Sequence, residues 1–335
     1  MQTKLIEPTN LQPAKDLIMG GETVVFPTET VYGLGANAFC ADAVKKIFKA
    51  KNRPADNPLI VHISSFEMLN RVCADFNPTA RAIAQAFMPG PITLVMKKKE
   101  EIPSVVSAGL PTVGIRFPKN KIARDFITLC DTPIAAPSAN ISGTVSATTF
   151  SDVKRELSGR VGGIIQGEDC EFGIESTVVD VTMEDPVILR PGSVTLEMLR
   201  EVVPNIRLHP SLISGSMEEK PASPGMKYTH YSPRAEVVLV YGEMEAILAH
   251  FEATLQKEEC LCLFSEEYDR FLGNKMLIGS KADLNEMAHL IFKILKQVDL
   301  LGYERVYVPA VEEKGIGLSI MNRMKKSSGG KAVRV

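Results

Sequence analysis

The chain is organised around Lys51-Asn52-Arg53-Pro54-Ala55-Asp56-Asn57-Pro58-Leu59-Ile60-Val61-His62. Each proline fixes its own φ and disfavours the α region for the residue before it, so Arg53 and Asn57 are expected to be extended. In an extended segment, Lys51 and Arg53 project to the same side, one as a point charge and one as a planar fork. Both groups suit a phosphate chain. A solvated connector is the alternative for this pattern taken alone.

The length and charge of the chain bear on its domain number and on nucleic-acid binding. A chain of 335 residues predicts two domains. Lysine and arginine total 38 against 40 aspartates and glutamates, and a cut at residue 209 leaves 22 basic and 23 acidic residues before it and 16 and 17 after it. Neither half is basic, so charge gives no argument for nucleic-acid binding.

The cysteines and the first residues bear on redox state and location. Six cysteines, at positions 40, 73, 130, 170, 260 and 262, form no CxxC pair and no zinc-site spacing, which predicts reduced, mostly buried thiols and no protein metal site. The first eight residues lack the apolar run of a signal peptide, and no later run reaches the roughly 18 apolar residues of a membrane span. A cytoplasmic protein without a membrane segment is expected.

Strand and helix patterns interleave irregularly before residue 204, which predicts a mixed α/β sheet. Pro27 to Ala36 reads as a loop of hydroxyls, a carboxylate and glycines at a strand end, where α/β sheets place ligands. Helices are expected at 11–20, 42–51, 79–88 and 149–158, and strands at 23–26, 59–63, 92–96, 112–118, 134–136, 163–165, 176–181 and 187–190.

The periodicity disappears between Pro204 and Pro233 and then returns. A stretch that contains Met226, two tyrosines and a histidine is expected to fold over something. Alternating strand and helix patterns after residue 236 predict a small parallel sheet, followed by a flexible tail from Ser327 to Val335. We therefore expect a first domain at 1–208, a linker or lid at 209–235 and a second domain at 236–335.

One theme recurs in the first domain, where apolar strand patterns end in a small polar or cationic residue. Taken alone, each such residue could have an ordinary structural role, as a turn cap, a hydrogen-bonded core histidine or a surface charge. Together they suit a ligand that carries both phosphate and carboxylate groups. No evident nucleophile or general base accompanies them, which favours catalysis by positioning and charge neutralisation. The set is Thr30, Lys51, Arg53, His62, Arg116, Ser138, Asn140, Ser176 and Arg190.

Common motifs are missing from the sequence. It contains no P-loop, no HExxH and no GxSxG elbow. The run from Gly33 to Ala38 fits a dinucleotide fingerprint only loosely, because it stands too far from the preceding strand and lacks an acidic ribose partner.

Six blocks carry a resemblance to a known family. They are Pro27 to Leu34, Lys51 to Pro54, Asn57 to His62, Pro89 to Leu94, Pro137 to Gly143 and Ser223 to Tyr228. In this order they resemble the YrdC-like threonylcarbamoyl-AMP synthases, in the long form that has an additional C-terminal domain. The resemblance covers essentially the whole chain. It implies a YrdC-like twisted mixed sheet with helices, plus a small C-terminal Rossmann-like parallel α/β domain.

The family's reaction is the formation of L-threonylcarbamoyladenylate and pyrophosphate from L-threonine, bicarbonate or CO2 and ATP. The resemblance implies a nucleotidyltransferase that acts with Mg²⁺ and ATP. Its product would pass to a tRNA threonylcarbamoyl transferase complex for threonylcarbamoyladenosine modification of tRNA, with at most a weak contact to tRNA itself.

Site residues carry over by matching position. Lys51, Arg53, Ser138 and Asn140 are the expected catalytic residues. The threonine site is expected to comprise Thr30, Tyr32, His62, Arg116 and Ser176. The ATP site is expected to comprise Lys51, Arg53, Asn57, Thr112, Ala136, Ser138, Asn140, Ser146, Arg190, His230 and Tyr231. In the covering loop, Thr229 stands where an arginine is common in the family.

Two other functions remain as alternatives. One is an RNA-binding module of the same fold without catalysis. The other is a carbamoyl-adenylate enzyme with a different acceptor, whose relatives carry zinc-finger and acylphosphatase segments that this sequence lacks.

Overall fold

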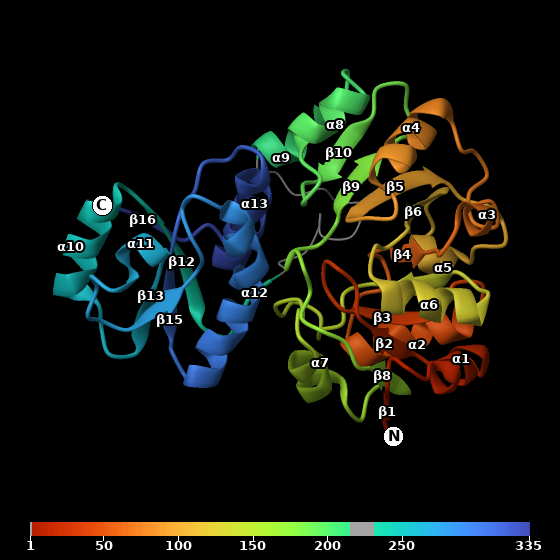
Figure 1. Ribbon diagram of the computed structural model, residues 1–335, viewed down its shortest axis with the longest axis horizontal. Helices are drawn as coiled ribbons and strands as arrows, with labels where there is room; N and C mark the ends of the chain where they lie inside the picture. The colour runs from red at the N-terminus through yellow and green to blue at the C-terminus, as the bar shows by residue number, and fades with distance from the viewer. Residues whose placement is uncertain (1, 215–230) are drawn as a thin grey trace. The chain divides into compact units, whose positions relative to one another are not determined.

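The computed structural model describes residues 2–214 and 231–335. The chain divides into two compact units, which are described separately (Figure 1). The larger unit contains Met1–Ser142, Ser146–Glu171 and Glu175–Tyr228, and the smaller contains Gly143–Val145, Phe172–Ile174 and Thr229–Val335.

The larger unit is built on one mixed sheet. Its strands are β1 (Lys4–Ile6), β2 (Val24–Phe26), β3 (Gly33–Asn37), β4 (Ile60–His62), β5 (Ile92–Lys97), β6 (Thr112–Arg116), β7 (Ile134–Ala136), β8 (Gly163–Ile165), β9 (Thr177–Asp180), β10 (Val187–Arg190) and β11 (Arg207–Leu208). Their order is β1-β8-β2-β3-β7-β4-β6-β5-β9-β10-β11. The sheet contains both parallel pairs, such as β4 with β6, and antiparallel pairs, such as β5 with β6, which confirms the predicted mixed α/β class.

Helices supply the rest of the core of this unit. They are α1 (Gln12–Met19), α2 (Ala41–Lys51), α3 (Phe66–Leu69), α4 (Pro78–Phe87), α5 (Ser104–Ser107), α6 (Lys121–Cys130), α7 (Phe150–Leu157), α8 (Leu196–Val202) and α9 (Pro210–Ser214). Side-chain caps start several of them, and the amide oxygen of Asn120 accepts from the N–H of Ala123 at the start of α6. Apolar residues of the helices and strands form one large core that includes Phe26, Ile115 and Phe126.

Strand register brings functional candidates together. The parallel pairing of β4 with β6 sets His62 opposite Arg116, each the last residue of its strand. The antiparallel pairing of β5 with β6 sets Thr93 opposite Arg116 on the other side. The prediction that polar groups stand at strand ends is therefore confirmed for His62, Arg116 and Arg190.

The smaller unit contains a second sheet, in which all pairings are parallel. Its strands are β12 (Glu236–Tyr241), β13 (Glu259–Leu263), β14 (Lys275–Leu277), β15 (Arg305–Pro309) and β16 (Ala332–Arg334), in the order β14-β13-β15-β12-β16. Its helices are α10 (Met244–Thr254), α11 (Ser265–Tyr268), α12 (Leu284–Leu301) and α13 (Ile316–Ser328). The parallel sheet predicted after residue 236 is confirmed.

Three local predictions are wrong. Lys51 does not share an extended segment with Arg53: as the helix predicted at 42–51 requires, it is the last residue of α2, which ends because Asn52 adopts a left-handed conformation (φ 52°, ψ 41°). Gly33–Asn37, predicted as a loop, forms β3 between β2 and β7. The expected tail is ordered, because residues to Ser328 extend α13 and Ala332–Arg334 pairs with β12.

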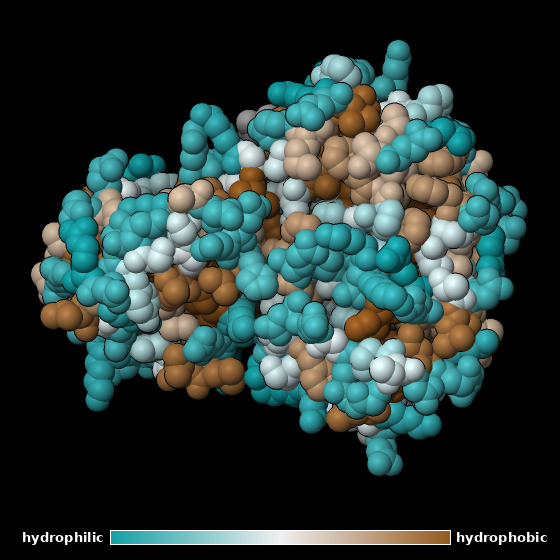
Figure 2. All heavy atoms as spheres, viewed as in Figure 1, coloured by the Kyte–Doolittle hydropathy of each residue, from teal (hydrophilic) through white to brown (hydrophobic). Residues whose placement is uncertain are grey.

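On the face drawn in Figure 2, hydrophilic residues cover most of the surface and hydrophobic residues form small patches. Among the described helices, none is long and apolar enough to span a membrane.

Candidate functional site

The turn between β2 and β3 is organised by the hydroxyl of Thr28. Its Oγ1 donates to the carbonyl oxygen of Val31 (2.6 Å) and accepts from the backbone N–H groups of Thr30 (3.2 Å) and Val31 (3.3 Å). Such side-chain bonds to nearby backbone replace the ladder that a strand would supply. The turn therefore holds Glu29 and Thr30 in fixed positions, and both are buried.

Arg116 is fixed against this turn. Its Nη1 donates to Thr30 Oγ1 (2.7 Å), and its Nη2 donates to Glu29 Oε1 (2.7 Å) and Thr28 Oγ1 (3.4 Å). Only 4% of the side chain of Arg116 is exposed. Its Nε–H is buried and has no hydrogen-bond partner among the described residues. A buried guanidinium donor without a partner is costly, so Arg116 is poised to receive an anionic group of a ligand.

Glu29 is the counter-charge of Arg116. Burial alone would raise the pKa of Glu29, but the charge of Arg116 and hydrogen bonds from Arg116 and from backbone lower that pKa below its usual value. One of these backbone donors is the N–H of Asn120, 3.2 Å from Glu29 Oε2. The pair therefore stays ionised at neutral pH.

His62 lies beside Arg116 and is buried. Burial and the nearby charge of Arg116 lower its pKa to about 3, so the ring is neutral at pH 7. Its Nδ1 lies 3.2 Å from the carbonyl oxygen of Ile60, and its ring stands edge-on to Phe26 at 5.6 Å. A neutral imidazole cannot act as a positive charge, but it can exchange hydrogen bonds with a ligand.

Ser176 and Arg190 form one bonded group on the neighbouring strands. The hydroxyls of Ser176 and Thr93 are 2.8 Å apart, and Arg190 donates to the carbonyl oxygen (3.1 Å) and the hydroxyl (3.2 Å) of Ser176. Gly192 permits this close approach, because a Cβ there would lie 2.3 Å from the backbone nitrogen of Thr177. The residue predicted for ATP, Arg190, therefore directly contacts one predicted for threonine.

Lys51 contacts the loop that follows β7. Its Nζ donates to the carbonyl oxygens of Ser138 (2.5 Å) and Asn140. Ser138 Oγ donates to Asn140 Oδ1 (2.6 Å), and the Asn140 amide donates to the carbonyl oxygen of Ile141 (2.8 Å). The side chain of Lys51 is almost completely buried. The three predicted catalytic residues Lys51, Ser138 and Asn140 are thus brought together around one ammonium group.

Arg53 lies in the same stretch but bonds locally. Its Nη2 donates to the carbonyl oxygens of Asn57 (3.3 Å) and Pro58 (3.2 Å). Asn57 is buried, and among the described residues its side-chain oxygen has no hydrogen-bond partner. The segment is therefore closed on itself by Arg53, and Asn57 retains acceptor capacity.

The remaining predicted residues are more scattered. Tyr32 is fully buried, with its hydroxyl donating to the carbonyl oxygen of Glu168 (3.1 Å). Ser146 Oγ donates to Glu175 Oε1 (2.6 Å). Thr112 starts β6, at the end opposite Arg116, and Ala136 ends β7.

Two predicted nucleotide residues belong to the C-terminal part of the chain. Tyr231 is buried in the smaller unit, where its ring stacks on Phe292 with centroids 5.1 Å apart. His230 and Thr229 lie outside the described residues.

Comparisons with known proteins identify the family of the chain. A family model described as "Telomere recombination" matches residues 16–192, and one described as "Threonylcarbamoyl-AMP synthase, C-terminal domain" matches residues 194–329. The threonylcarbamoyl-AMP synthase of Pyrococcus abyssi is 44% identical over 98% of this chain and 97% of its own length. The chain belongs to the threonylcarbamoyl-AMP synthase family. It is therefore a nucleotidyltransferase-type enzyme.

Further relatives extend across the whole chain. The threonylcarbamoyl-AMP synthase of Bacillus subtilis is 39% identical over 96% of this chain and 93% of its own length. The crystal structure of P. abyssi Sua5 complexed with L-threonine has a TM-score of 0.91 and 41% identity, and the match covers 100% of both chains. The predicted family and fold are confirmed.

Several residues that the structure places against the predicted site residues were not predicted from the sequence. Glu29 and Thr28 stand within the first family block but were not assigned a role, and Thr93 and Glu175 were not singled out. The signal for Glu29 was its position between two threonines at a strand end. Its partner Arg116 is 87 residues away, so no spacing rule connects the two.

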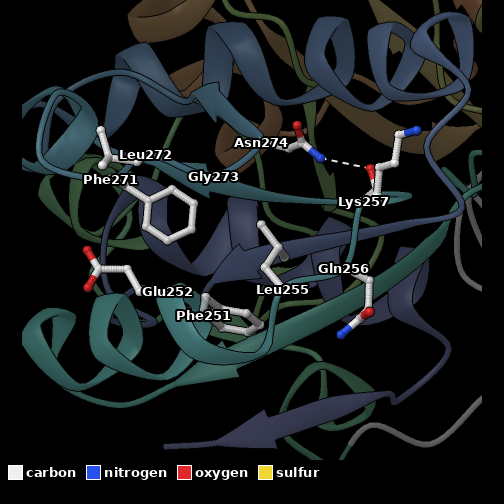
Figure 3. Close-up of a pocket in the computed structure, with 9 residues that line it drawn as sticks. All are labelled: Phe251, Glu252, Leu255, Gln256, Lys257, Phe271, Leu272, Gly273 and Asn274. Carbon is white, nitrogen blue, oxygen red and sulfur yellow. Dashed lines mark hydrogen bonds between the residues drawn. The ribbon is translucent and has the colours of Figure 1, made fainter.

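The smaller unit has a cavity of its own, of about 580 Å³, between the C-terminal end of α10 with the residues that follow it and the segment 271–274 that precedes β14. Figure 3 shows the side chains of Phe251, Leu255 and Phe271 directed toward one another there, while Asn274 bonds to the backbone of Lys257 (2.8 Å). Within residues 2–214 and 231–335, no group of three or more histidine, cysteine or acidic residues could hold a metal ion.

Proposed function

We propose that the chain forms L-threonylcarbamoyladenylate and pyrophosphate from L-threonine, bicarbonate or CO2 and ATP, for threonylcarbamoyladenosine modification of tRNA. The observation that carries this proposal is Arg116, whose buried Nε–H has no hydrogen-bond partner among residues 2–214 and 231–335 while its other donors bind Thr30 and Glu29. A carboxylate beside Arg116 and a hydroxyl or amine beside Thr30 and Ser176 match the groups of threonine. The similarity to a structure complexed with L-threonine supports the same substrate.

The chemistry proceeds in two steps. The threonine amine adds to CO2, or to bicarbonate with loss of water, and the N–C bond that forms gives a carbamate. A carbamate oxygen then attacks the α-phosphorus of ATP, and the bond to the β-phosphate oxygen breaks to release pyrophosphate. Positioning of the reactants can supply roughly 7 to 11 kcal/mol of barrier reduction, so no protein nucleophile is needed.

Lys51 and its neighbours are proposed to hold the phosphates. The ammonium group of Lys51 is buried among oxygen atoms of Ser138 and Asn140, which aims a fixed positive charge at this loop. Charge of this kind stabilises the negative charge that develops during phosphoryl transfer. Arg53, Asn57 and Arg190 are proposed to complete the ATP site, together with Thr112, Ala136, Ser146, His230 and Tyr231.

Mg²⁺ is proposed to enter with ATP. Mg²⁺ is usually bound through one or two carboxylates together with substrate phosphates. Here the nearby carboxylates Glu29 and Glu175 are hydrogen-bonded to Arg116 and Ser146. We infer that the phosphates of ATP supply most of the ligands and that the bound ion would neutralise phosphate charge.

The biological setting is proposed from the family. The adenylate product would be consumed by a transferase that acts on tRNA, and the reaction would take place in the cytoplasm. The alternative of a non-catalytic RNA-binding module finds less support, because the two halves of the sequence are close to neutral.

The test is a coupled measurement on the purified protein. With L-threonine, ATP, Mg²⁺ and ¹⁴C-bicarbonate, pyrophosphate release and a labelled adenylate should appear together and should require threonine. Pyrophosphate that forms without threonine, or no product at all with fresh bicarbonate, would contradict the proposal. Salt-sensitive binding of tRNA without any turnover would favour the RNA-binding alternative.

A further inference from the structure

Among the described residues, Glu29 is the one charged side chain that pairs with Arg116. No step of the proposed reaction uses it. It is 2% exposed and lies 2.7 Å from Arg116 Nη2. Its second oxygen, Oε2, accepts from the N–H of Asn120 at the start of α6. Both carboxylate oxygens are therefore tied, one to the guanidinium and one to the backbone of a helix.

This arrangement fixes the plane of the guanidinium. The hydroxyl of Thr30 accepts from Nη1 of Arg116 and the carboxylate of Glu29 accepts from Nη2, so the guanidinium has little freedom to rotate. The carboxylate is in turn held by a helix start and by a turn that Thr28 closes. Supporting contacts of this kind determine how closely a binding group keeps its productive geometry.

We propose that Glu29 is a positioning residue that fixes Arg116 for the carboxylate of the substrate amino acid. The inference rests on the proposed function, because it assumes that the substrate is threonine. Glu29 does not take up the proton of the threonine amine, since both of its oxygens are occupied. The lowered pKa of Glu29 also makes it a weak base.

Three roles for Glu29 give different kinetics. A positioning group acts through geometry, so its loss raises the KM for threonine and leaves the KM for ATP unchanged. A group that only weakens the positive charge of Arg116 would, when neutralised, make threonine bind more tightly. A proton acceptor would, when neutralised, lower kcat without a change in threonine affinity.

The experiment compares Glu29→Gln and Glu29→Ala with wild type by pyrophosphate release and threonine calorimetry, after circular dichroism and thermal melting. Gln keeps the acceptor for Arg116 and loses only the charge and the bond from Asn120. We expect a threonine KM within about threefold of wild type for Gln and at least about tenfold higher for Ala. We expect an ATP KM within about twofold and a kcat within about fivefold for both. Asp42→Asn, in an exposed pair with Lys45 (2.9 Å), is the matched control and should match wild type.

Several outcomes would overturn the inference. They are tighter threonine binding by Glu29→Gln, a kcat loss of about a hundredfold in Glu29→Gln with unchanged threonine affinity, or an unchanged threonine KM in a folded Glu29→Ala protein. If Glu29→Ala does not fold, threonine binding by Glu29→Gln decides the question alone. A loss of threonine affinity beyond about tenfold in Glu29→Gln would show that the retained acceptor does not keep Arg116 in position. Failure of wild type to release pyrophosphate would instead count against the proposed function.

Discussion

Arg116 and Glu29 form an ion pair that is almost completely buried, and this has a consequence for stability. Removing one partner of such a pair leaves a charge without compensation, which typically costs about 3–5 kcal/mol. We therefore expect Arg116→Met to lower the free energy of unfolding by about 3 kcal/mol, measured by urea denaturation at pH 7. Adding Glu29→Gln to that variant should restore part of the loss, because the orphaned charge is gone. A double variant less stable than Arg116→Met would contradict this.

Arg116 and Arg53 are assigned to different substrates, so their variants should affect different kinetic constants. Arg116→Ala should raise the KM for threonine by at least about tenfold, since the substrate carboxylate loses its guanidinium. Arg53→Ala should instead weaken ATP binding and turnover by about tenfold or more. Steady-state kinetics with each substrate varied in turn provide the measurement. Equal losses for both substrates in either variant would undo these assignments.

His62 makes stability depend on pH. The unfolded ring has a pKa of about 6.5, whereas the folded ring has a pKa of about 3. Between these values the unfolded state binds the additional proton, so stability is lost as pH falls through this window, by at most about 1.4 kcal/mol per pH unit. Wild type should therefore lose on the order of 3 kcal/mol between pH 6.5 and pH 4 through this residue.

The control for this effect is His62→Gln, which has no proton to bind. Its unfolding free energy should fall less than that of wild type over the same pH range. Glu29, with its lowered pKa, loses its contribution at lower pH in both proteins. Parallel curves for wild type and variant would show that His62 titrates normally in the folded state.

Strand β16 completes the sheet of the smaller unit. It pairs with β12, and the N–H groups of Leu239 and Val335 donate to the carbonyl oxygens of Lys331 and Tyr241. A chain ended after Gly330 loses these bonds, at about 0.5–1.5 kcal/mol each, and exposes an edge of β12. We expect a lower melting temperature and faster proteolysis within residues 236–335. Leu272→Ser, at a side chain that is 94% exposed, should leave both unchanged.

The elements that the sequence predicts are those with a strong local pattern. Helix α12 repeats apolar residues on one face, and the parallel strands of the smaller unit are short apolar runs, so both were predictable. Strand β3 was not, because three small residues precede Asn37 and glycine normally weakens strands. Close packing explains it, since a Cβ at Gly35 would lie 2.5 Å from a methyl carbon of Ile134.

The candidate site was likewise predictable only in part. Lys51 was predictable from the family blocks, and Arg116 from its place near the end of an apolar strand pattern. The contacts between them were not, because they join residues 83 to 89 positions apart through the register of the sheet. The helix that ends at Lys51 was predictable, but the prolines that follow it wrongly suggested that Lys51 and Arg53 share one extended segment.

At the scale of the whole molecule, the residues expected to bind threonine and their neighbour Arg190 form a cluster that belongs to one unit. Thr30, His62, Arg116, Ser176 and Arg190 all lie in the larger unit, and the hydrogen-bond partners described above for them lie there too. That unit has a large core of its own, and a domain with its own core can fold alone. A chain of residues 1–214 should therefore remain folded and bind L-threonine with a Kd within about threefold of the full chain.

Calorimetry on this shortened chain and on the full chain, each without ATP, measures the difference. Arg116→Ala in the shortened chain should remove binding, which ties the signal to the cluster. A folded 1–214 chain with no threonine binding would mean that residues 215–335 supply part of the threonine site. Retained binding together with lost pyrophosphate release would instead confine the contribution of residues 215–335 to the nucleotide half of the reaction.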